Sequence, residues 1–169
     1  HLYLGSRINY GAGQFDNPWF WKVLAPCHDV VSVNYYGRWG PQADEFADWA
    51  AWADRPVLIT EWYAKAMDVV PKLANTHGAG WLVRTQEDRA RYYQQFALNA
   101  LETKNIVGWH FFKYLDDGPE SKALDNLGGA NKGLCDVAGK PYAPLLERAR
   151  AVNREVYPLI DFFDARGAK

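Results

Sequence analysis

The stretch from Arg55 to Trp62 decides the fold of this chain and reads Arg-Pro-Val-Leu-Ile-Thr-Glu-Trp. Its centre is a continuous apolar run, which is typical of a strand in a parallel sheet that is buried on both faces. The run ends on a carboxylate, Glu61, and a carboxylate at that place costs free energy unless it is paired or used. The pattern therefore predicts a buried strand that delivers Glu61 to one edge of the sheet. A solvated residue at a strand end is the alternative.

Three further segments have the apolar, β-branched or aromatic composition of strands: Leu2 to Asn9, Asp29 to Tyr36 and Ile106 to Tyr114. Helical patterns, with apolar residues three and four apart, lie between and after them. These patterns cover Asp16 to Leu24, Gln42 to Ala53, Thr85 to Lys104 and Pro144 to Val156. Strands that alternate with helices predict an α/β fold with a parallel sheet.

The 169 residues hold about four such βα units, which is half of a (βα)8 TIM barrel of about 250 residues. Because the chain starts on a strand-like segment without an initiator Met, we expect one partial barrel domain over residues 1–169. An isolated half-barrel has open sheet edges. We therefore expect either a missing half-barrel as partner or self-association.

Composition excludes several classes of protein. The 19 Lys and Arg against 20 Asp and Glu give a formal net charge of -1, so a nucleic-acid partner is not expected. No apolar run is long enough to predict a membrane span. The two cysteines and four histidines show no metal-ligand spacing, and no phosphate-binding glycine loop stands out, so we expect no metal and no cofactor. Whether Cys27 and Cys135 pair is open at this point.

The chain is rich in aromatic residues, with 8 Trp, 10 Tyr and 8 Phe. Such residues fill a core or line a cleft that stacks on flat, weakly polar ligands such as sugars. Two long connections, Ala64 to Leu82 and Asp116 to Lys140, follow predicted strands. Ligands of parallel α/β folds bind at the carboxyl ends of strands, where these connections begin.

The second predicted strand ends on Asn34, Tyr35 and Tyr36, at the same height as Glu61. A tyrosine hydroxyl there could hydrogen-bond the Glu61 carboxylate, and core filling is the alternative for both tyrosines. Arg7, late in the first segment, is a candidate for a substrate oxygen or for a structural ion pair.

The last predicted strand is an aromatic platform, with Trp109 and Phe111 on one side and His110, Phe112 and Tyr114 on the other. Aromatic rings in this position suit stacking on a sugar face. His110 or Lys113 could bind sugar hydroxyls or an acidic substituent, although a structural role is the alternative for the histidine.

Together these segments resemble a family. The run from Val57 to Trp62 resembles the end of strand seven in clan A glycoside hydrolases, which are retaining (βα)8-barrel enzymes with a glutamate nucleophile at that place. Val31 to Tyr36 resembles their strand six, which often carries a tyrosine that bonds the nucleophile, and Val107 to Asp116 resembles strand eight. The resemblance covers the whole chain and makes it the C-terminal half of the barrel, strands 5 to 8.

Within the clan the chain looks most like the β-agarase type, glycoside hydrolase family 50 and unassigned relatives. Four segments carry this likeness: His1 to Gly5, Gln86 to Arg89, Gly108 to Tyr114 and Val152 to Pro158. One departure is Glu61-Trp62-Tyr63, where agarases of this type would show Glu-Phe-His.

The resemblance implies a retaining hydrolase of a galactan-like polysaccharide such as agarose, with Glu61 as nucleophile. Its acid/base carboxylate would come from an Asn-Glu pair at the end of strand four, outside this chain. We therefore expect little or no turnover from these residues alone; otherwise an acid must be sought among Asp68, Asp116 and Asp117. The expected substrate-binding residues are Arg7, Asn34, Tyr35, Tyr36, Trp62, Trp109, His110, Phe112 and Lys113.

Two other functions stay open. The same aromatic residues would suit a non-catalytic carbohydrate-binding half-barrel, and a structural half-barrel that pairs with itself would need no ligand. Polysaccharide hydrolases of this kind are usually exported, so the resemblance also implies a secreted or periplasmic protein.

Overall fold

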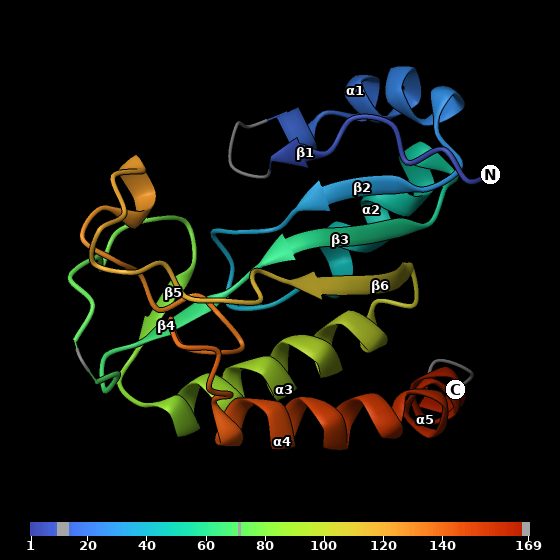
Figure 1. Ribbon diagram of the computed structural model, residues 1–169. Helices are drawn as coiled ribbons and strands as arrows, with labels where there is room; N and C mark the ends of the chain where they lie inside the picture. Colours follow the sequence, from blue (N-terminus) through green and yellow to red (C-terminus); the bar gives the residue numbers. More distant parts are fainter. Residues whose placement is uncertain (10–13, 71, 167–169) are drawn as a thin grey trace. The chain divides into compact units, whose positions relative to one another are not determined.

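The computed structural model describes residues 1–9, 14–70 and 72–166, which form two compact units (Figure 1). The first, here called the sheet unit, contains His1–Trp62, Phe96–His110 and the C-terminal segment from Glu155. The second, the loop unit, contains Tyr63–Gln95 and Phe111–Arg154.

A four-stranded sheet forms the centre of the sheet unit. Its order is β1 (Ile8–Asn9), β2 (Val31–Asn34), β3 (Val57–Trp62) and β6 (Ile106–Phe111). β1 pairs in parallel with β2, and β2 pairs in parallel with β3. β6 lies beside β3 and its arrow points the same way in Figure 1. The prediction of an α/β fold with a parallel sheet is confirmed.

The helices of this unit begin and end on recognisable signals. α1 (Pro18–Leu24) starts with proline at its first position, and the Asn17 side chain accepts a hydrogen bond from the backbone N–H of Trp19 at 3.0 Å. α2 (Ala43–Ala53) ends at Asp54, whose φ of 50° is left-handed and stops the helix. Two 3-10 turns, η1 (Gln14–Asp16) and η2 (Ala25–Cys27), and the terminal helix α5 (Val156–Arg166) complete the unit.

The loop unit has little regular structure. A two-stranded parallel sheet joins β4 (Ala64–Ala66) to β5 (Trp81–Val83), and a 3-10 turn, η3, spans Leu124–Asn126. The unit also contains α4 (Ala143–Arg154) and the first turns of α3 (Gln86–Glu102), a helix that continues into the sheet unit.

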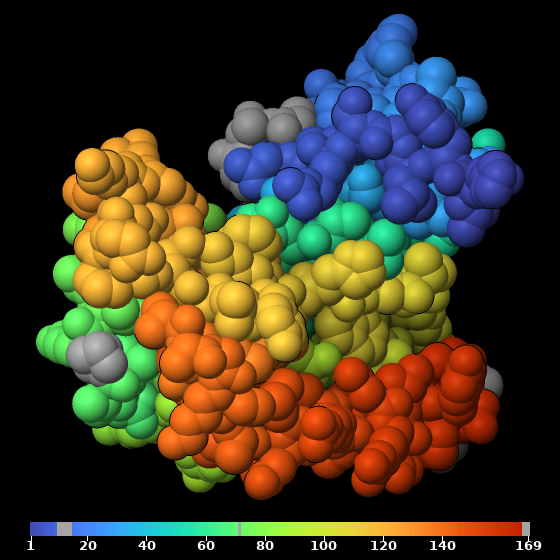
Figure 2. Space-filling model, viewed as in Figure 1, coloured from blue at the N-terminus to red at the C-terminus, as the bar shows by residue number. Residues whose placement is uncertain are grey.

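The first predicted strand, Leu2 to Asn9, is the largest error of the sequence analysis, since only Ile8 and Asn9 are in the sheet. Gly5 breaks it with a left-handed φ of 60°, and a Cβ at this position would lie 1.6 Å from Nε2 of His28. The residues before Gly5 contact the rest of the sheet unit without forming a strand. For example, the N–H of Tyr3 donates to the Asp29 carboxylate at 2.7 Å. These first residues lie on the surface, dark blue in Figure 2.

Two other differences concern elements that the sequence analysis missed. The connection from Ala64 to Leu82 contains β4 and most of β5, whose three-residue strands are too short to show a period. α4 ends at Arg154 and a separate helix, α5, follows, although Pro158 suggests a stop. Proline is tolerated there because it occupies the first turn of α5, where its missing N–H has no intrahelical partner.

Much of the aromatic excess fills the core of the sheet unit. Phe15, Trp21 and Trp49 are all buried, with ring centroids 4.9 to 5.6 Å apart. β2 is buried along its whole length, and Val57 and Ile59 of β3 are buried as well. The stretch from Arg55 to Trp62, from which a buried strand was predicted, therefore lies in the core of the sheet unit.

None of the described helices is long and apolar enough to cross a membrane. Cys27 is exposed, Cys135 is buried, and both are free thiols. Within the described ranges, no group of three or more His, Cys, Asp and Glu side chains is placed to hold a metal ion.

We predict that Trp49→Ala lowers the free energy of unfolding by about 3–5 kcal/mol, because it removes a fully buried indole that packs on four other rings. Trp19→Ala is the matched control: Trp19 is 74% exposed, and its loss should change stability by less than about 0.5 kcal/mol. Urea denaturation measures both. If the two variants lose the same stability, Trp49 is not packed in the core as described.

Candidate active site

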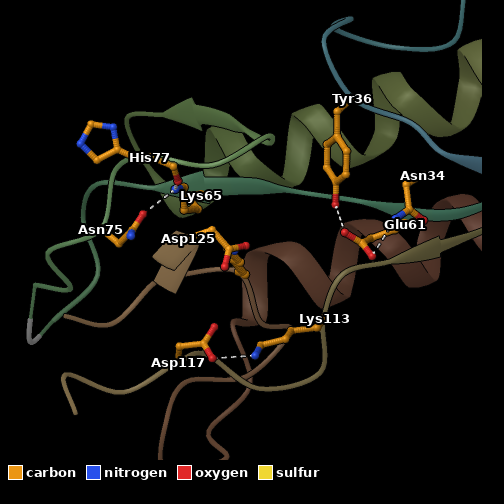
Figure 3. A network of polar contacts seen from close by, with 10 residues as sticks. Asn34, Tyr36, Glu61, Lys65, Asn75, His77, Lys113, Asp117 and Asp125 are labelled. Carbon is orange, nitrogen blue, oxygen red and sulfur yellow. Dashed lines mark hydrogen bonds and ion pairs between the residues drawn. The ribbon is translucent and has the colours of Figure 1, made fainter. Parts of the chain in front are cut away.

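Glu61 is the centre of a polar cluster at the carboxyl end of β3 (Figure 3). The Tyr36 hydroxyl donates to Glu61 Oε1 at 2.6 Å, and the Asn34 amide Nδ2 donates to Glu61 Oε2 at 3.1 Å. Nη2 of Arg7 lies 3.5 Å from the same Oε2. The Glu61 side chain is 15% exposed. Its carboxylate therefore lies at the rim of the sheet, with a hydrogen-bond donor on each oxygen.

The pairing of β2 with β3 brings these groups together. Asn34 is the register partner of Glu61, and the N–H of Tyr35 donates to the backbone carbonyl of Glu61 at 2.8 Å. Since side chains alternate along an extended chain, Asn34 and Tyr36 point toward the carboxylate while Tyr35 points away. Figure 3 shows Asn34 and Tyr36 converging on Glu61 from the same side of β3.

Tyr35 and Trp62 lie in the core, and we remove both from the expected substrate-binding set. Tyr35 is 1% exposed, and its hydroxyl donates to Glu45 of α2 at 2.6 Å. Trp62 is 0% exposed and stacks on Phe96 with ring centroids 3.6 Å apart. The physical reason is again alternation: each is the chain neighbour of a residue that faces the site, so its own side chain faces the core.

Two members of the aromatic platform belong to the sheet unit. Trp109 is half-buried and His110 is exposed, as expected for successive residues on β6. Both lie on the strand beside the one that carries Glu61.

Phe112 and Lys113 of the expected substrate-binding set belong to the loop unit, where they take part in a cluster of lysines and aromatic rings. Nζ of Lys113 lies 2.7 Å from the Asp117 carboxylate, and Nζ of Lys132 lies 5.8 Å from the centre of the Phe112 ring. Lys132 is also 4.8 Å from the ring centre of Tyr63. The rings therefore stabilise a buried cation, in addition to any role in binding sugars.

Lys65 and Lys132 of the loop unit are buried, which the sequence analysis did not predict. Lys132 is 0% exposed and pairs with Asp125 at 2.9 Å, which holds the pKa of that carboxyl below its usual range. Lys65 donates to the Asn75 side chain and to the carbonyl of His77 (Figure 3). Burial, together with the charge of Lys132, lowers the pKa of Lys65 to about 8.

The loop after β6 is held by Asp116, a buried carboxylate. It accepts hydrogen bonds from the Asn131 amide at 2.9 Å, the N–H of Gly133 at 2.6 Å and the hydroxyl of Tyr142 at 2.5 Å. Burial and the bond to Asp116 raise the pKa of Tyr142. Asp116 therefore anchors the loop.

Arg89 of α3 ties this loop to β4. Its guanidinium is fully buried and donates to the carbonyls of Ala64 and Gly133, each at 2.7 Å. It also lies 5.4 Å from the ring centres of Phe111 and Tyr142. Burial lowers the pKa of Arg89 to about 10. In the sequence, Gln86 to Arg89 contributes to the family resemblance, but nothing in this segment indicates that the Arg89 side chain is buried.

The remaining acid candidates also have structural partners. Asp68 accepts a hydrogen bond from the N–H of Gln86 at 3.1 Å, at the start of α3, and Asp117 pairs with Lys113. Sequence reasoning also gave no role to Thr60, whose hydroxyl lies 3.0 Å from the carbonyl of Val33.

The chain is similar to known proteins over most of its length. No family model matches the chain. β-Agarase B from Vibrio sp. (strain JT0107) is 31% identical over 162 residues, which cover 94% of this chain and 16% of that protein. The crystal structure of BpGH50 superposes with a TM-score of 0.84 at 42% identity, covering 96% of this chain and 33% of its own. An exo-β-agarase structure gives 0.79 at 30% identity over 95% of this chain and 20% of its own.

The parallel sheet and these likenesses make the chain homologous to part of a glycoside hydrolase. More particularly, it is homologous to a region of the β-agarases and of glycoside hydrolase family 50 structures, as the sequence resemblance indicated. The chain spans between about a sixth and a third of the length of these relatives.

We predict that Lys65 makes the stability of the fold rise with pH above 8. Between pH 8 and the usual lysine pKa of 10.5, the unfolded chain holds a proton that the folded chain has released. Stability should therefore increase, by up to about 1.4 kcal/mol per pH unit. Urea denaturation at pH 8 and 9.5 measures this increase.

The matched variants are Lys65→Met, which should lose the increase, and Lys72→Met, an exposed lysine of the same loop, which should keep it. If the pH dependence of Lys65→Met equals that of the wild type, Lys65 is not the group responsible.

Proposed function

We propose that this chain is the C-terminal half of a (βα)8-barrel glycoside hydrolase that cleaves a galactan-like polysaccharide, such as agarose, with retention of configuration. The observation that carries the proposal is Glu61, a carboxylate at the carboxyl end of a central parallel strand, held on both oxygens by hydrogen-bond donors. Agarose as substrate rests on the likeness to agarases.

The half-barrel is supported by the sheet. Its strands run in order along the chain, β1, β2, β3 and β6, and those with assigned register are parallel. Helices α1, α2 and α3 separate them, as in the βα repeat of a barrel. In such a barrel the two outer strands would pair with strands of a preceding half, which is the partner we propose.

Glu61 would act as the nucleophile. Its carboxylate oxygen attacks the anomeric carbon while the glycosidic C–O bond breaks, and an acid outside these residues protonates the leaving oxygen. Water then displaces Glu61 from the covalent glycosyl-enzyme, with that second group acting as base. The two carboxyl groups of a retaining enzyme lie about 5–5.5 Å apart.

Tyr36 and Asn34 would keep the Glu61 carboxylate in one orientation during the attack. Arg7 is 55% exposed and only 3.5 Å from Oε2, so it is placed to contact a sugar hydroxyl beside the nucleophile. Trp109 and His110 of β6 are proposed for the sugar platform. Phe112 and Lys113 of the loop unit are proposed separately as substrate contacts. A polysaccharide substrate agrees with a secreted or periplasmic enzyme.

We predict that Glu61→Gln in a full-length protein that carries this chain lowers kcat by at least about 1,000-fold, because an amide cannot displace the leaving group. Binding of oligosaccharide should persist. Glu45→Gln is a close control, since Glu45 also accepts a bond from a tyrosine hydroxyl but lies on α2. Reducing-sugar release and calorimetry measure the two effects.

If Glu61→Gln keeps the turnover of the wild type, the hydrolase mechanism is wrong. If sugar binds and neither the wild type nor any variant releases product, the carbohydrate-binding half-barrel takes its place.

We predict that residues 1–169 alone release no reducing ends from agarose, because we propose that the acid/base carboxylate comes from the preceding half-barrel. Addition of the preceding half-barrel as a separate chain should restore turnover. Turnover by residues 1–169 alone would contradict the account and direct the search to Asp68, Asp116 and Asp117.

A further inference from the structure

Thr60 occupies an irregular point of the sheet, directly before Glu61. Along β2 and β3, Val33 pairs with Ile59 and the next residue, Asn34, pairs with Glu61, so that Thr60 is skipped. An extra residue of this kind re-aims the side chains around it. Here the hydroxyl of Thr60 reaches across to β2, where it lies 3.0 Å from the carbonyl of Val33 and 3.2 Å from Oδ1 of Asn34.

The contact with Oδ1 defines which way the Asn34 amide is turned. The single proton of the Thr60 hydroxyl is shared between the Val33 carbonyl and Oδ1 of Asn34, and the contact with Oδ1 leaves the NH2 group on the opposite side, where it donates to Oε2 of Glu61 at 3.1 Å. Thr60, Asn34 and Glu61 thus form a short relay, hydroxyl to amide to carboxylate. Asn34 is 9% exposed, so water has little access to replace either bond.

We propose that Thr60 is a positioning residue for the nucleophile, acting through Asn34; this rests on the proposed function of Glu61. While Glu61 is a carboxylate, its charge itself attracts the NH2 group. Once Glu61 forms a glycosyl ester, that charge is gone and the ester oxygen is a weaker acceptor. Thr60 then keeps the amide in place, so the same donor serves both the attack and the hydrolysis of the intermediate.

The first test uses residues 1–169 and side-chain amide NMR of Asn34, assigned by its loss in Asn34→Asp. The shift of the Asn34 NH2 signals on Glu61→Gln measures the amide–carboxylate bond. We expect Thr60→Val to reduce that shift by more than half, and Thr60→Ser, which keeps the hydroxyl, to preserve it. Thr60→Ala is a second variant without the hydroxyl, in case the valine variant does not fold.

The matched control is Thr103→Val, which removes another buried threonine hydroxyl, one that donates to the carbonyl of Ala100 at 2.7 Å. It should leave the Asn34 signals as they are. If Thr60→Val or Thr60→Ala leaves the shift unchanged, or if Thr103→Val reduces it equally, the relay does not exist.

The second test is kinetic and uses a full-length protein that carries this chain. Thr60→Val should lower kcat by about 10-fold with KM within about twofold, and Thr60→Ser should restore kcat, because one bond to the reacting carboxylate is loosened. A change in KM alone would overturn a positioning role. The two proposals can be refuted separately. An active Glu61→Gln enzyme would show that Glu61 is not the nucleophile, whereas the NMR evidence for the contacts among Thr60, Asn34 and Glu61 would still stand.

Discussion

The pairing of β2 with β3 is the constraint on which the site depends. It sets Asn34 against Glu61 and joins the backbone of Tyr35 to that of Glu61, so the orientation of every neighbouring side chain follows. Asn34 and Tyr36 face the carboxylate, while Tyr35 and Trp62 face the core. A slip of β2 by one residue would turn Asn34 and Tyr36 away from the carboxylate and turn Tyr35 toward it.

Several charged side chains near the ends of the strands hold the loops together. In the loop unit, buried Arg89 and Asp116 tie the segment after β6 to β4 and α3, and buried Lys132 pairs with Asp125. Such groups are stable in a buried site only when their hydrogen bonds are satisfied. The long loops that follow the strands are therefore ordered by polar contacts as well as by apolar packing.

The sequence predicted what depends on local pattern. The apolar run before Glu61 indicated a central strand, the alternation of strands and helices indicated a parallel sheet, and Glu61 is where that pattern puts it. The choice between Tyr35 and Tyr36 stayed open because the skipped residue at Thr60 changes the register and leaves no mark in a single sequence. The break at Gly5 depends on the distant His28 ring, and the burial of Arg89 depends on partners 25 and 44 residues away. Such contacts are properties of the folded chain.

The central claim is that Glu61 forms a covalent bond to sugar. The most direct measurement is mass spectrometry of a full-length protein that carries this chain, after incubation with a 2-deoxy-2-fluorogalactoside bearing an activated leaving group. The fluorine slows both steps through an oxocarbenium-like transition state, and the good leaving group lets the intermediate accumulate. The account predicts one fluorosugar on the peptide that contains Glu61, and none in Glu61→Gln. A label on another carboxylate, or hydrolysis with inverted configuration and no label, would contradict it.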